Sequence, residues 1–169
     1  MRMPAITLET ERLRLRPPRM EDLAAHHAAL GSDGGVTWLG EPRSLADSEA
    51  VLRRRVEHFE QHGFGMWVVE LADTGEFLGE AGLQHFEGTE EVEVGYYLAR
   101  ATWGAGVATE AGRTAIAHGF DTLGLGHIVA VVRPENAGSK RVLTKLGLRF
   151  DHLGDHYDVA GVEVWRIDR

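Results

Sequence analysis

A glycine-rich turn stands where a strand-like segment gives way to a helix-like segment. Apolar residues alternate through 92–98 as in a strand, and from Ala108 onward they recur at helical spacing. Gly104 and Gly106 lie between the two segments. The N-terminus of a helix presents unpaired N–H groups and about half a unit of positive charge, and glycine lets an anion approach the main chain. The spacing predicts a phosphate-binding turn, with a plain tight turn as the alternative.

Two common phosphate motifs do not fit this turn. The P-loop pattern is absent and no lysine lies in the turn, so a kinase-like ATP site is disfavoured. The dinucleotide fingerprint fails because Thr109 stands where the third glycine belongs. In the phosphate-binding interpretation, a Cβ on Gly106 is expected to occupy the place of the phosphate.

Charge is unevenly distributed along the chain. The net charge of -8 argues against a general nucleic-acid-binding protein. Residues 100–149 nevertheless carry seven Lys and Arg against three Asp and Glu, a local balance of +4, which leaves -12 for the rest. This positive segment indicates either a site for an anionic small molecule or ordinary solvated helix faces.

Length and composition predict one cytoplasmic domain over residues 1–169, with no membrane contact. The chain has 169 residues, which is long enough to form a hydrophobic core that needs no disulfide bond or structural metal for stability. No apolar stretch approaches the roughly 20 residues that span a bilayer, and the first residues lack the apolar region of a signal peptide. The absence of cysteine excludes disulfides, thiolate metal sites and a cysteine nucleophile.

The predicted elements describe a mixed α+β domain with about four helices. Ser44 begins a capping-box-like sequence and Gly63 ends that helix, while Asn136 and Gly147 bound another helix. The order β-α-α-β-β-β-α-β-α-β-β places a βαβ crossover inside an otherwise antiparallel, twisted sheet. We expect strands at 11–16, 66–72, 77–86, 91–98, 127–132, 148–153 and 162–167, and helices at 21–30, 44–63, 108–122 and 136–147.

Three linked segments resemble the GNAT superfamily of acetyl-CoA-dependent N-acetyltransferases. They are a strand, the sequence WGAGVATEA at 103–111, and RPENAGSKRVLTKLG at 133–147. The sequences LETERLRLRPPRMEDL at 8–23, HGFGMW at 62–67 and VEVGYYL at 92–98 are similar to the RimJ/RimL branch, which acetylates the N-terminal amines of ribosomal proteins. The resemblance covers nearly the whole chain and implies the GNAT fold.

The resemblance implies a binding site for acetyl-CoA as cosubstrate. The family's pyrophosphate loop aligns with 103–108, where Trp103 replaces the usual Arg or Gln, so main-chain donors are expected to bind the diphosphate. Asn136 resembles the asparagine that reaches the pantetheine arm. Lys140 and Arg141 match the 3′-phosphate contacts, with exposed helix cations as the alternative. The implied cofactor-binding set is Tyr97, Leu98, Trp103, Gly104, Ala105, Gly106, Val107, Ala108, Thr109, Asn136, Ser139, Lys140 and Arg141.

The implied chemistry is direct attack of an amine on the thioester, because no cysteine is available. Ser139 matches a serine proposed to protonate the leaving thiolate, or it is a helix-start serine that bonds nearby backbone. Glu80 and Glu93 are the candidate bases on strands that run toward the site, and Glu93 is preferred although alternation places it opposite Val92 and Val94. The family also implies a bulge near Tyr97 and Leu98 whose N–H polarises the carbonyl.

Nine histidines raise the question of a metal site. The pairs His58 and His62, and His152 and His156, have i,i+4 spacing, but neither is an HExxH motif, so surface histidines and no metal are expected. Trp38, Trp67 and Trp165 are expected in the core or a pocket wall. The segment Gly31–Leu39, with the helix from Ser44, is expected to set acceptor specificity.

The sequence therefore predicts an N-acetyltransferase acting on a primary amine. A protein N-terminal α-amine is placed first, because its pKa near 8 makes deprotonation cheaper than for lysine near 10.4. A small-molecule amine is second. A non-catalytic acyl-CoA sensor on the same fold is the alternative function, and both a monomer and a homodimer are compatible with the sequence.

Overall fold

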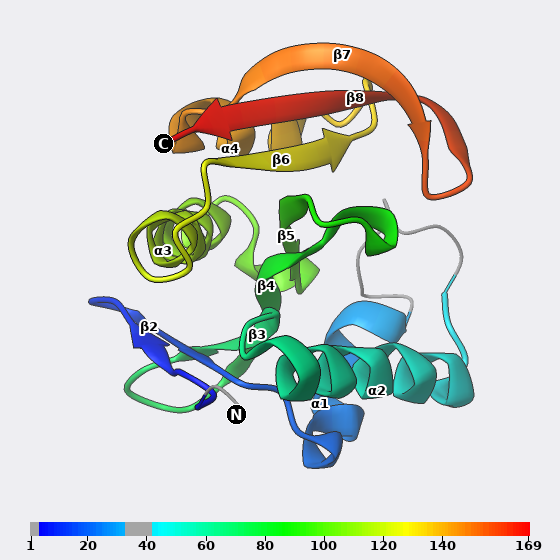
Figure 1. The fold of residues 1–169 in the computed structure, drawn as a ribbon. Helices are drawn as coiled ribbons and strands as arrows, with labels where there is room; N and C mark the ends of the chain where they lie inside the picture. The colour runs from blue at the N-terminus through cyan, green and yellow to red at the C-terminus, as the bar shows by residue number, and fades with distance from the viewer. Residues whose placement is uncertain (1–3, 33–41) are drawn as a thin grey trace.

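One sheet of eight strands organises the protein, in the order β1-β2-β3-β4-β5-β6-β8-β7 (Figure 1). The computed structural model describes residues 4–32 and 42–169. Among these strands only β5 and β6 pair in parallel, and α3 crosses between them. The strands are β1 Leu8–Glu9, β2 Leu13–Arg16, β3 Met66–Leu71, β4 Phe77–His85, β5 Val92–Leu98, β6 His127–Val132, β7 Arg149–His156 and β8 Val159–Asp168.

Four helical regions cover the sheet, in the order that the sequence predicts. They are α1 Leu23–His26, continued by a π turn at His27–Gly31, then α2 Leu45–His62, α3 Val107–Asp121 and α4 Ala137–Leu146. Short 3₁₀ turns lie at Met20–Asp22, Phe86–Gly88 and Arg100–Thr102. The mixed α+β fold with one βαβ crossover is confirmed. The strand β1 was not predicted, and the last two strands are longer than expected.

The helix ends follow the capping signals of the sequence. The Ser44 side chain accepts from the N–H of Asp47 at 3.1 Å, and Gly63 ends α2 in the left-handed region with φ of 76°. The Asn136 side chain accepts from the N–H of Ser139 at 3.0 Å, and Gly147 ends α4 with φ of 91°. These local caps fix where α2 and α4 begin and end.

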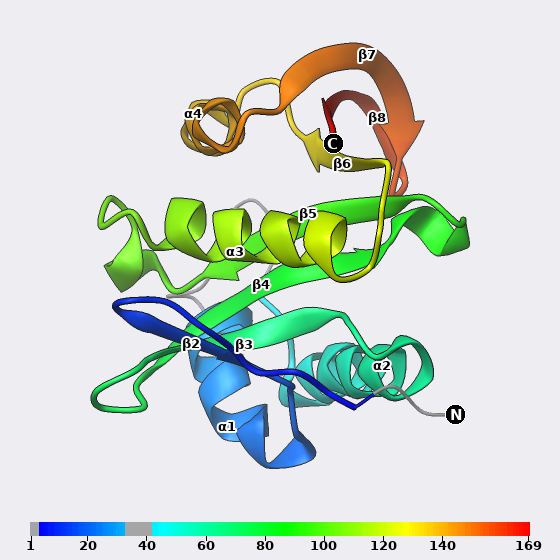
Figure 2. The ribbon, with the colours of Figure 1, turned by 60° about the vertical axis from the view of Figure 1, so that its left-hand side comes forward.

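The two faces of the central strands have different roles. Val92, Val94 and Leu98 of β5 lie in the hydrophobic core with Ala111 and Ala115 of α3. The alternate residues of β5 point to the opposite face, the side on which α1 and α2 lie (Figures 1 and 2). A buried polar network occupies that second face. No helix in the described ranges is long and apolar enough to span a bilayer.

Candidate active site

A cavity of about 900 Å³ lies where β5 and β6 separate. The two strands pair at a single position, Glu93 with Val129, and diverge beyond it. The cavity walls come from β5, the glycine turn, the end of β6 with the start of α4, and the β7–β8 hairpin. The lining includes these predicted residues: Glu93, Tyr97, Leu98, Trp103, Gly104, Gly106, Val107, Ala108, Thr109, Asn136, Ser139 and Arg141.

The main-chain amides of the glycine turn are free to bind a ligand. Gly104 and Gly106 take the left-handed conformation with φ of 80° and 79°, and α3 begins directly after them. Within the described part of the chain, the N–H groups from Gly104 to Thr109 have no protein acceptor. The amide of Glu110 is the first to bond, to the carbonyl of Gly106 at 3.0 Å. Consecutive orphan donors at a helix N-terminus favour an anion.

Part of the turn faces β2 instead of the cavity. The Ala105 carbonyl accepts from Nη1 of Arg12 at 3.0 Å, and Ala105 does not line the cavity. A Cβ on Gly106 would lie 3.5 Å from Nη2 of Arg12, and the expectation that it would occupy the phosphate position stays a prediction. Gly106 is needed for its positive φ. Arg12, which also bonds Glu110 at 2.6 Å, holds the turn from outside and was missed by the sequence reasoning.

The cations at the cavity differ in part from those predicted. Arg141 lines the cavity, as do Arg133 and Lys145, which were not singled out. Lys140 does not line it, because its Nζ bonds the carbonyl of Pro134 and Oε1 of Glu163, each at 3.0 Å. The i,i+4 spacing of Arg141 and Lys145 places both on the same face of α4. In the sequence, this spacing was the signal that could have identified Lys145 as a cavity residue beside Arg141.

A tyrosine and a serine hydroxyl meet inside the cavity. The Oη of Tyr96 lies 2.9 Å from the Oγ of Ser139, and either hydroxyl can be the donor. Burial raises the pKa of Tyr96 to about 12, so its hydroxyl carries a proton at neutral pH. The carbonyl oxygen of Asn136 is used as the cap of α4, which leaves its NH₂ group to face a ligand. Tyr96 was not predicted as a site residue.

The strand β5 runs without the bulge that the family resemblance implied. Its pairing with β4 is continuous from Leu98 opposite Gly79 to Val92 opposite His85. The N–H of Ala99 donates to the carbonyl of Leu78 at 2.8 Å, and main-chain bonding alternates along antiparallel strands. The amide of Leu98 therefore points away from β4 toward the cavity, whereas the amide of Tyr97 points toward β4.

Glu93 is a buried carboxylate with two hydrogen-bond donors. It is 5% exposed, and it lies on the face opposite Val92 and Val94, as alternation requires. Its Oε1 accepts from the hydroxyl of Tyr157 and from Nε2 of Gln84 at 2.5 Å. Burial raises the pKa of Glu93, and the two donors oppose that rise. A carboxylate with a raised pKa is suited to accept a proton near neutral pH.

Glu80 lies on the same face as Glu93 but is fully engaged. Its Oε1 accepts from Nη2 of Arg55 at 2.9 Å, and its Oε2 lies 3.3 Å from Nε2 of His26. Burial alone would raise the pKa of Glu80, but Arg55 and His26 outweigh burial and lower it to about 2. Glu80 lines neither of the two cavities described here. This geometry suits a group that fixes Arg55 better than a group that accepts a proton.

Arg55 connects the two carboxylates through a side chain that the sequence reasoning missed. Its Nη1 donates to Oε1 of Gln84 at 2.5 Å, and Gln84 donates to Glu93. The guanidinium also lies over the ring of Tyr97, 5.9 Å from its centroid. The buried hydrogen-bond network Glu80–Arg55–Gln84–Glu93 thus depends on Arg55, which α2 contributes. No local sequence motif predicts this contribution.

Tyr157 stands between the large cavity and a second cavity of about 450 Å³. It occupies a two-residue hairpin turn in which Tyr157 and Asp158 have positive φ, 55° and 60°. Glu87 holds this turn, because its Oε1 accepts from the N–H of Tyr157 at 2.6 Å and its Oε2 bonds His156 at 2.8 Å. Tyr97 also lines both cavities. The second cavity is lined by Tyr157 and Gln84, the two residues that donate to Glu93, whereas Glu93 itself lines the large cavity.

Most of the predicted specificity segment lies outside the described residues. Of Gly31–Leu39 only Gly31 and Ser32 are among the described residues, and Trp38 lies outside them. Trp67 is fully buried in the core, as predicted. Trp165 packs against the same core.

Comparisons with known proteins agree with this geometry. The acetyltransferase (GNAT) domain family matches residues 12–149, which include the glycine turn and α4. The uncharacterized protein YkkB of Bacillus subtilis is 32% identical over 146 residues, 85% of each chain. A crystal structure of an acetyltransferase from Agrobacterium tumefaciens has a TM-score of 0.86 at 32% identity, over 97% of this chain and 95% of that chain. RimJ of Mycobacterium smegmatis, in complex with CoA-disulfide, has a TM-score of 0.72 at 27% identity, over 92% of this chain and 81% of that one.

Proposed function

This chain belongs to the GNAT family of acetyltransferases, and on that premise we propose that it moves an acetyl group from acetyl-CoA directly to a primary amine. We place the α-amine of a protein N-terminus first among acceptors, within the RimJ/RimL-like branch. The observation that carries the proposal is one cavity that joins free amides at the glycine turn to the buried carboxylate of Glu93. The free amides are suited to bind a diphosphate, and the carboxylate of Glu93 is suited to accept a proton.

Acetyl-CoA would lie along the large cavity. The amides of Gly104–Thr109 would bind the diphosphate, and the NH₂ group of Asn136 would meet the pantetheine arm. The 3′-phosphate would meet Arg141 and Lys145 at the cavity edge instead of Lys140. The amide of Leu98, which the splayed strands leave unpaired with β6, would donate to the thioester carbonyl oxygen.

The transfer itself requires two proton movements. The amine nitrogen forms a bond to the acetyl carbon and loses a proton to Glu93, directly or through a water. The carbon–sulfur bond then breaks, and the thiolate takes a proton from the hydroxyl pair of Tyr96 and Ser139. Glu80 acts as a positioning residue, because it fixes Arg55 and through Gln84 the orientation of Glu93. We thus assign the base to Glu93 and not to Glu80.

The acceptor preference follows from the strength of the base. An α-amine near pKa 8 loses its proton about two units more easily than a lysine amine. A carboxylate of modestly raised pKa is therefore adequate for an α-amine. The cavity beyond Tyr157 offers Glu87 as an anionic group near the entry of a cationic amine. A small-molecule amine is the second acceptor class. The cytoplasmic location, the single domain and the monomeric or dimeric state stay predictions.

The test measures thiol release from acetyl-CoA with matched acceptors. Short peptides with a free N-terminus and no lysine are compared with the same peptides carrying a blocked N-terminus and an internal lysine, and with small primary amines. We expect turnover on the free N-termini, with the acetyl group located there by mass spectrometry. Turnover on small amines alone would assign the second acceptor class. Acetyl-CoA binding with no turnover on any acceptor would favour a non-catalytic acyl-CoA sensor.

A further inference from the structure

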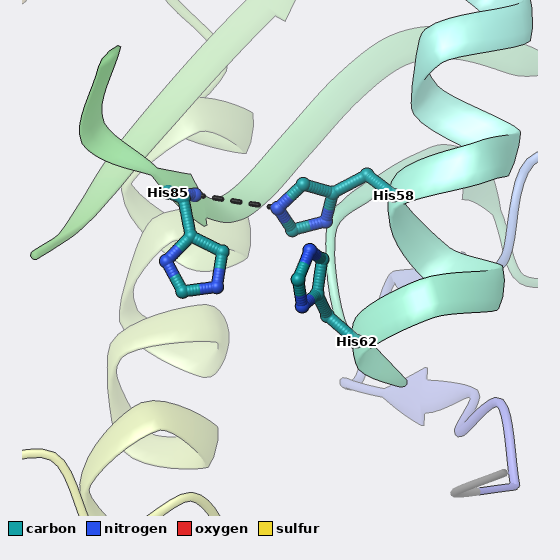
Figure 3. Close-up of side chains that lie close together, drawn as sticks. All are labelled: His58, His62 and His85. Atoms are coloured by element: carbon teal, nitrogen blue, oxygen red, sulfur yellow. Dashed lines mark hydrogen bonds between the residues drawn. The ribbon is translucent and has the colours of Figure 1, made fainter. Parts of the chain in front are cut away.

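Three histidines from α2 and β4 lie close together on the α2 side of the sheet (Figure 3). None of the three lines the large cavity. His58 and His62 lie on the last turns of α2, and His85 lies at the end of β4. One ring nitrogen from each lies within 4.8 Å of those of the other two. The ring centroids are 4.6 Å apart for His58 and His62, 4.6 Å for His62 and His85, and 5.5 Å for His58 and His85. The sequence indicated only the helical pair.

Both ring nitrogens of His58 have hydrogen-bond partners. Its Nδ1 donates to the carbonyl of Phe64 at 2.8 Å, since a carbonyl can only accept. Its Nε2 must then be unprotonated, and it accepts a long bond of 3.3 Å from the N–H of His85. Metal-binding histidines characteristically donate their second ring nitrogen to such a carbonyl, which fixes the tautomer. Nε2 is thus the nitrogen of His58 that can bind a metal, and an ion that uses its lone pair must displace the long bond from the N–H of His85.

His85 supplies an independent observation. Its Nδ1 is buried and has no hydrogen-bond partner among the described residues. A buried polar atom without a partner costs about 1–3 kcal/mol, and such an atom usually meets a water or an ion. The ring of Phe64 packs against all three imidazoles, with centroid distances of 5.3 Å, 6.1 Å and 5.5 Å to His58, His62 and His85. This apolar wall disfavours positive charge on the rings.

The donor set selects the class of ion. The three donors are imidazole nitrogens, which suit Zn²⁺, Ni²⁺ and Cu²⁺ and do not suit Mg²⁺ or Ca²⁺. Burial lowers the pKa of His58 to about 4 and also lowers that of His62, which agrees with neutral rings. Tetrahedral zinc with bonds near 2.0–2.1 Å needs ligand nitrogens about 3.3 Å apart, so the rings must close by about 1.5 Å or less. His62 is exposed and can rotate.

We propose that His58, His62 and His85 bind one zinc-class divalent ion, with water in the fourth position, and that the ion fastens the end of α2 to β4. The site carries no step of the acetyl transfer. His58 and His85 line the second cavity, so the ion would stiffen the wall through which an acceptor approaches. The expected consequence is stabilisation of the folded state that rises with the logarithm of the free metal concentration once this exceeds the Kd.

The test uses tag-free protein treated with a chelator, titrated with Zn²⁺ by calorimetry and with Co²⁺ by visible absorption. We expect one ion per chain, the intense Co²⁺ bands of four-coordinate geometry, and a Zn²⁺-dependent rise in melting temperature. His62→Gln and His85→Phe each remove one ligand, and each should weaken binding at least as much as the roughly 10- to 100-fold loss that outer-shell changes cause. His85→Phe keeps a ring in the cluster. His152→Gln, from the spacing-matched pair on β7, should change nothing.

Two results would overturn the proposal. One is the absence of saturable one-to-one binding in the parent protein at concentrations of Zn²⁺ that give no precipitate. The other is equal Zn²⁺ affinity in the parent, His62→Gln and His85→Phe, which would assign the binding to scattered surface histidines. Because the readouts are heat, absorption and melting temperature, they are independent of whether the acyl-transfer proposal is correct.

Discussion

The hydroxyl of Tyr157, at the tip of the β7–β8 hairpin, donates to the carboxylate of Glu93 at the point where β5 and β6 meet. Tyr157 is more than 60 residues from Glu93 in the chain, and Glu87 holds its turn in a left-handed conformation. Such backbone strain in a non-glycine residue is often found at functional sites. The contact ties the protonation of the proposed base to the position of the hairpin.

Tyr157→Phe should move the acid limb of the pH–rate profile to higher pH. Burial already raises the pKa of Glu93, and loss of a donor to its ionised form raises it further. A hydrogen bond to a charged group is worth about 1.5–3 kcal/mol, or about one to two pKa units. Activity is lost as pH falls through this pKa, so the variant is least active below pH 7 and recovers as pH rises. Tyr96→Phe is the control whose acid limb should not move, and an unchanged limb in Tyr157→Phe would contradict the assignment.

Glu93→Gln should separate catalysis from cosubstrate binding. The amide keeps the size of the side chain and one acceptor oxygen for Tyr157, but it cannot accept a proton. General base catalysis contributes typically about 10²–10⁴ in rate, so kcat should fall by that amount while the Kd for acetyl-CoA stays within about twofold. Single-turnover kinetics and calorimetry measure the two quantities. A variant with normal kcat would remove Glu93 from the mechanism.

Local signals in the sequence predicted the fold and the turn between β5 and α3. Ser44, Asn136 and the glycines that follow their helices set the helix ends, and Gly104 and Gly106 marked the turn before α3, because capping and positive φ are properties of short segments. The pairing of Lys140 with Glu163 could not be predicted, because Glu163 lies on a distant strand.

The missed residues depend on long-range packing. Arg55 reaches the site from α2, and His85 joins a helical histidine pair from β4, so neither position has a local pattern that indicates its role. Tyr157 follows a strand that the sequence predicted to end at residue 153. The additional pairs of β7 and β8, from Leu153 to Val159, bring this tyrosine to the site.

Glu80→Gln should lower the free energy of unfolding, because Glu80 is the charge partner of a buried arginine. Its effect on kcat should be smaller than that of Glu93→Gln. The change leaves the buried guanidinium of Arg55 without its charge partner, and loss of one partner of a buried pair costs about 3–5 kcal/mol. The pKa of Glu80 is lowered from 4.5 to about 2, so its ionisation stabilises the fold above about pH 4.5, and this contribution fades as pH falls toward 2. Urea unfolding at pH 7 and pH 3 should show a gap between parent and variant that narrows in acid. A gap that widens in acid would contradict the ion pair.

Ala108→Pro should weaken CoA binding with little effect on the fold. Proline is tolerated in the first turn of a helix, and here it removes an N–H that has no acceptor in the described structure. Loss of one hydrogen bond to a charged phosphate, about 1.5–3 kcal/mol, predicts roughly 10- to 100-fold weaker binding of CoA by calorimetry. Leu45→Pro places the same residue at the start of α2, and it should leave the affinity unchanged. If Ala108→Pro and Leu45→Pro both bound CoA as tightly as the parent protein, the glycine turn would have only a structural role.

Lys145→Ala and Lys140→Ala should have different effects on recognition of the 3′-phosphate. Lys145 lines the large cavity, whereas Lys140 is bonded to Glu163 and Pro134 away from it. A partly exposed charge pair contributes about 0.2–1 kcal/mol, so Lys145→Ala should bind CoA about two- to fivefold more weakly and should lose much of its preference for CoA over 3′-dephospho-CoA. Lys140→Ala should retain that preference. The reverse result, with the preference lost only in Lys140→Ala, would show that Lys140 leaves Glu163 when CoA binds.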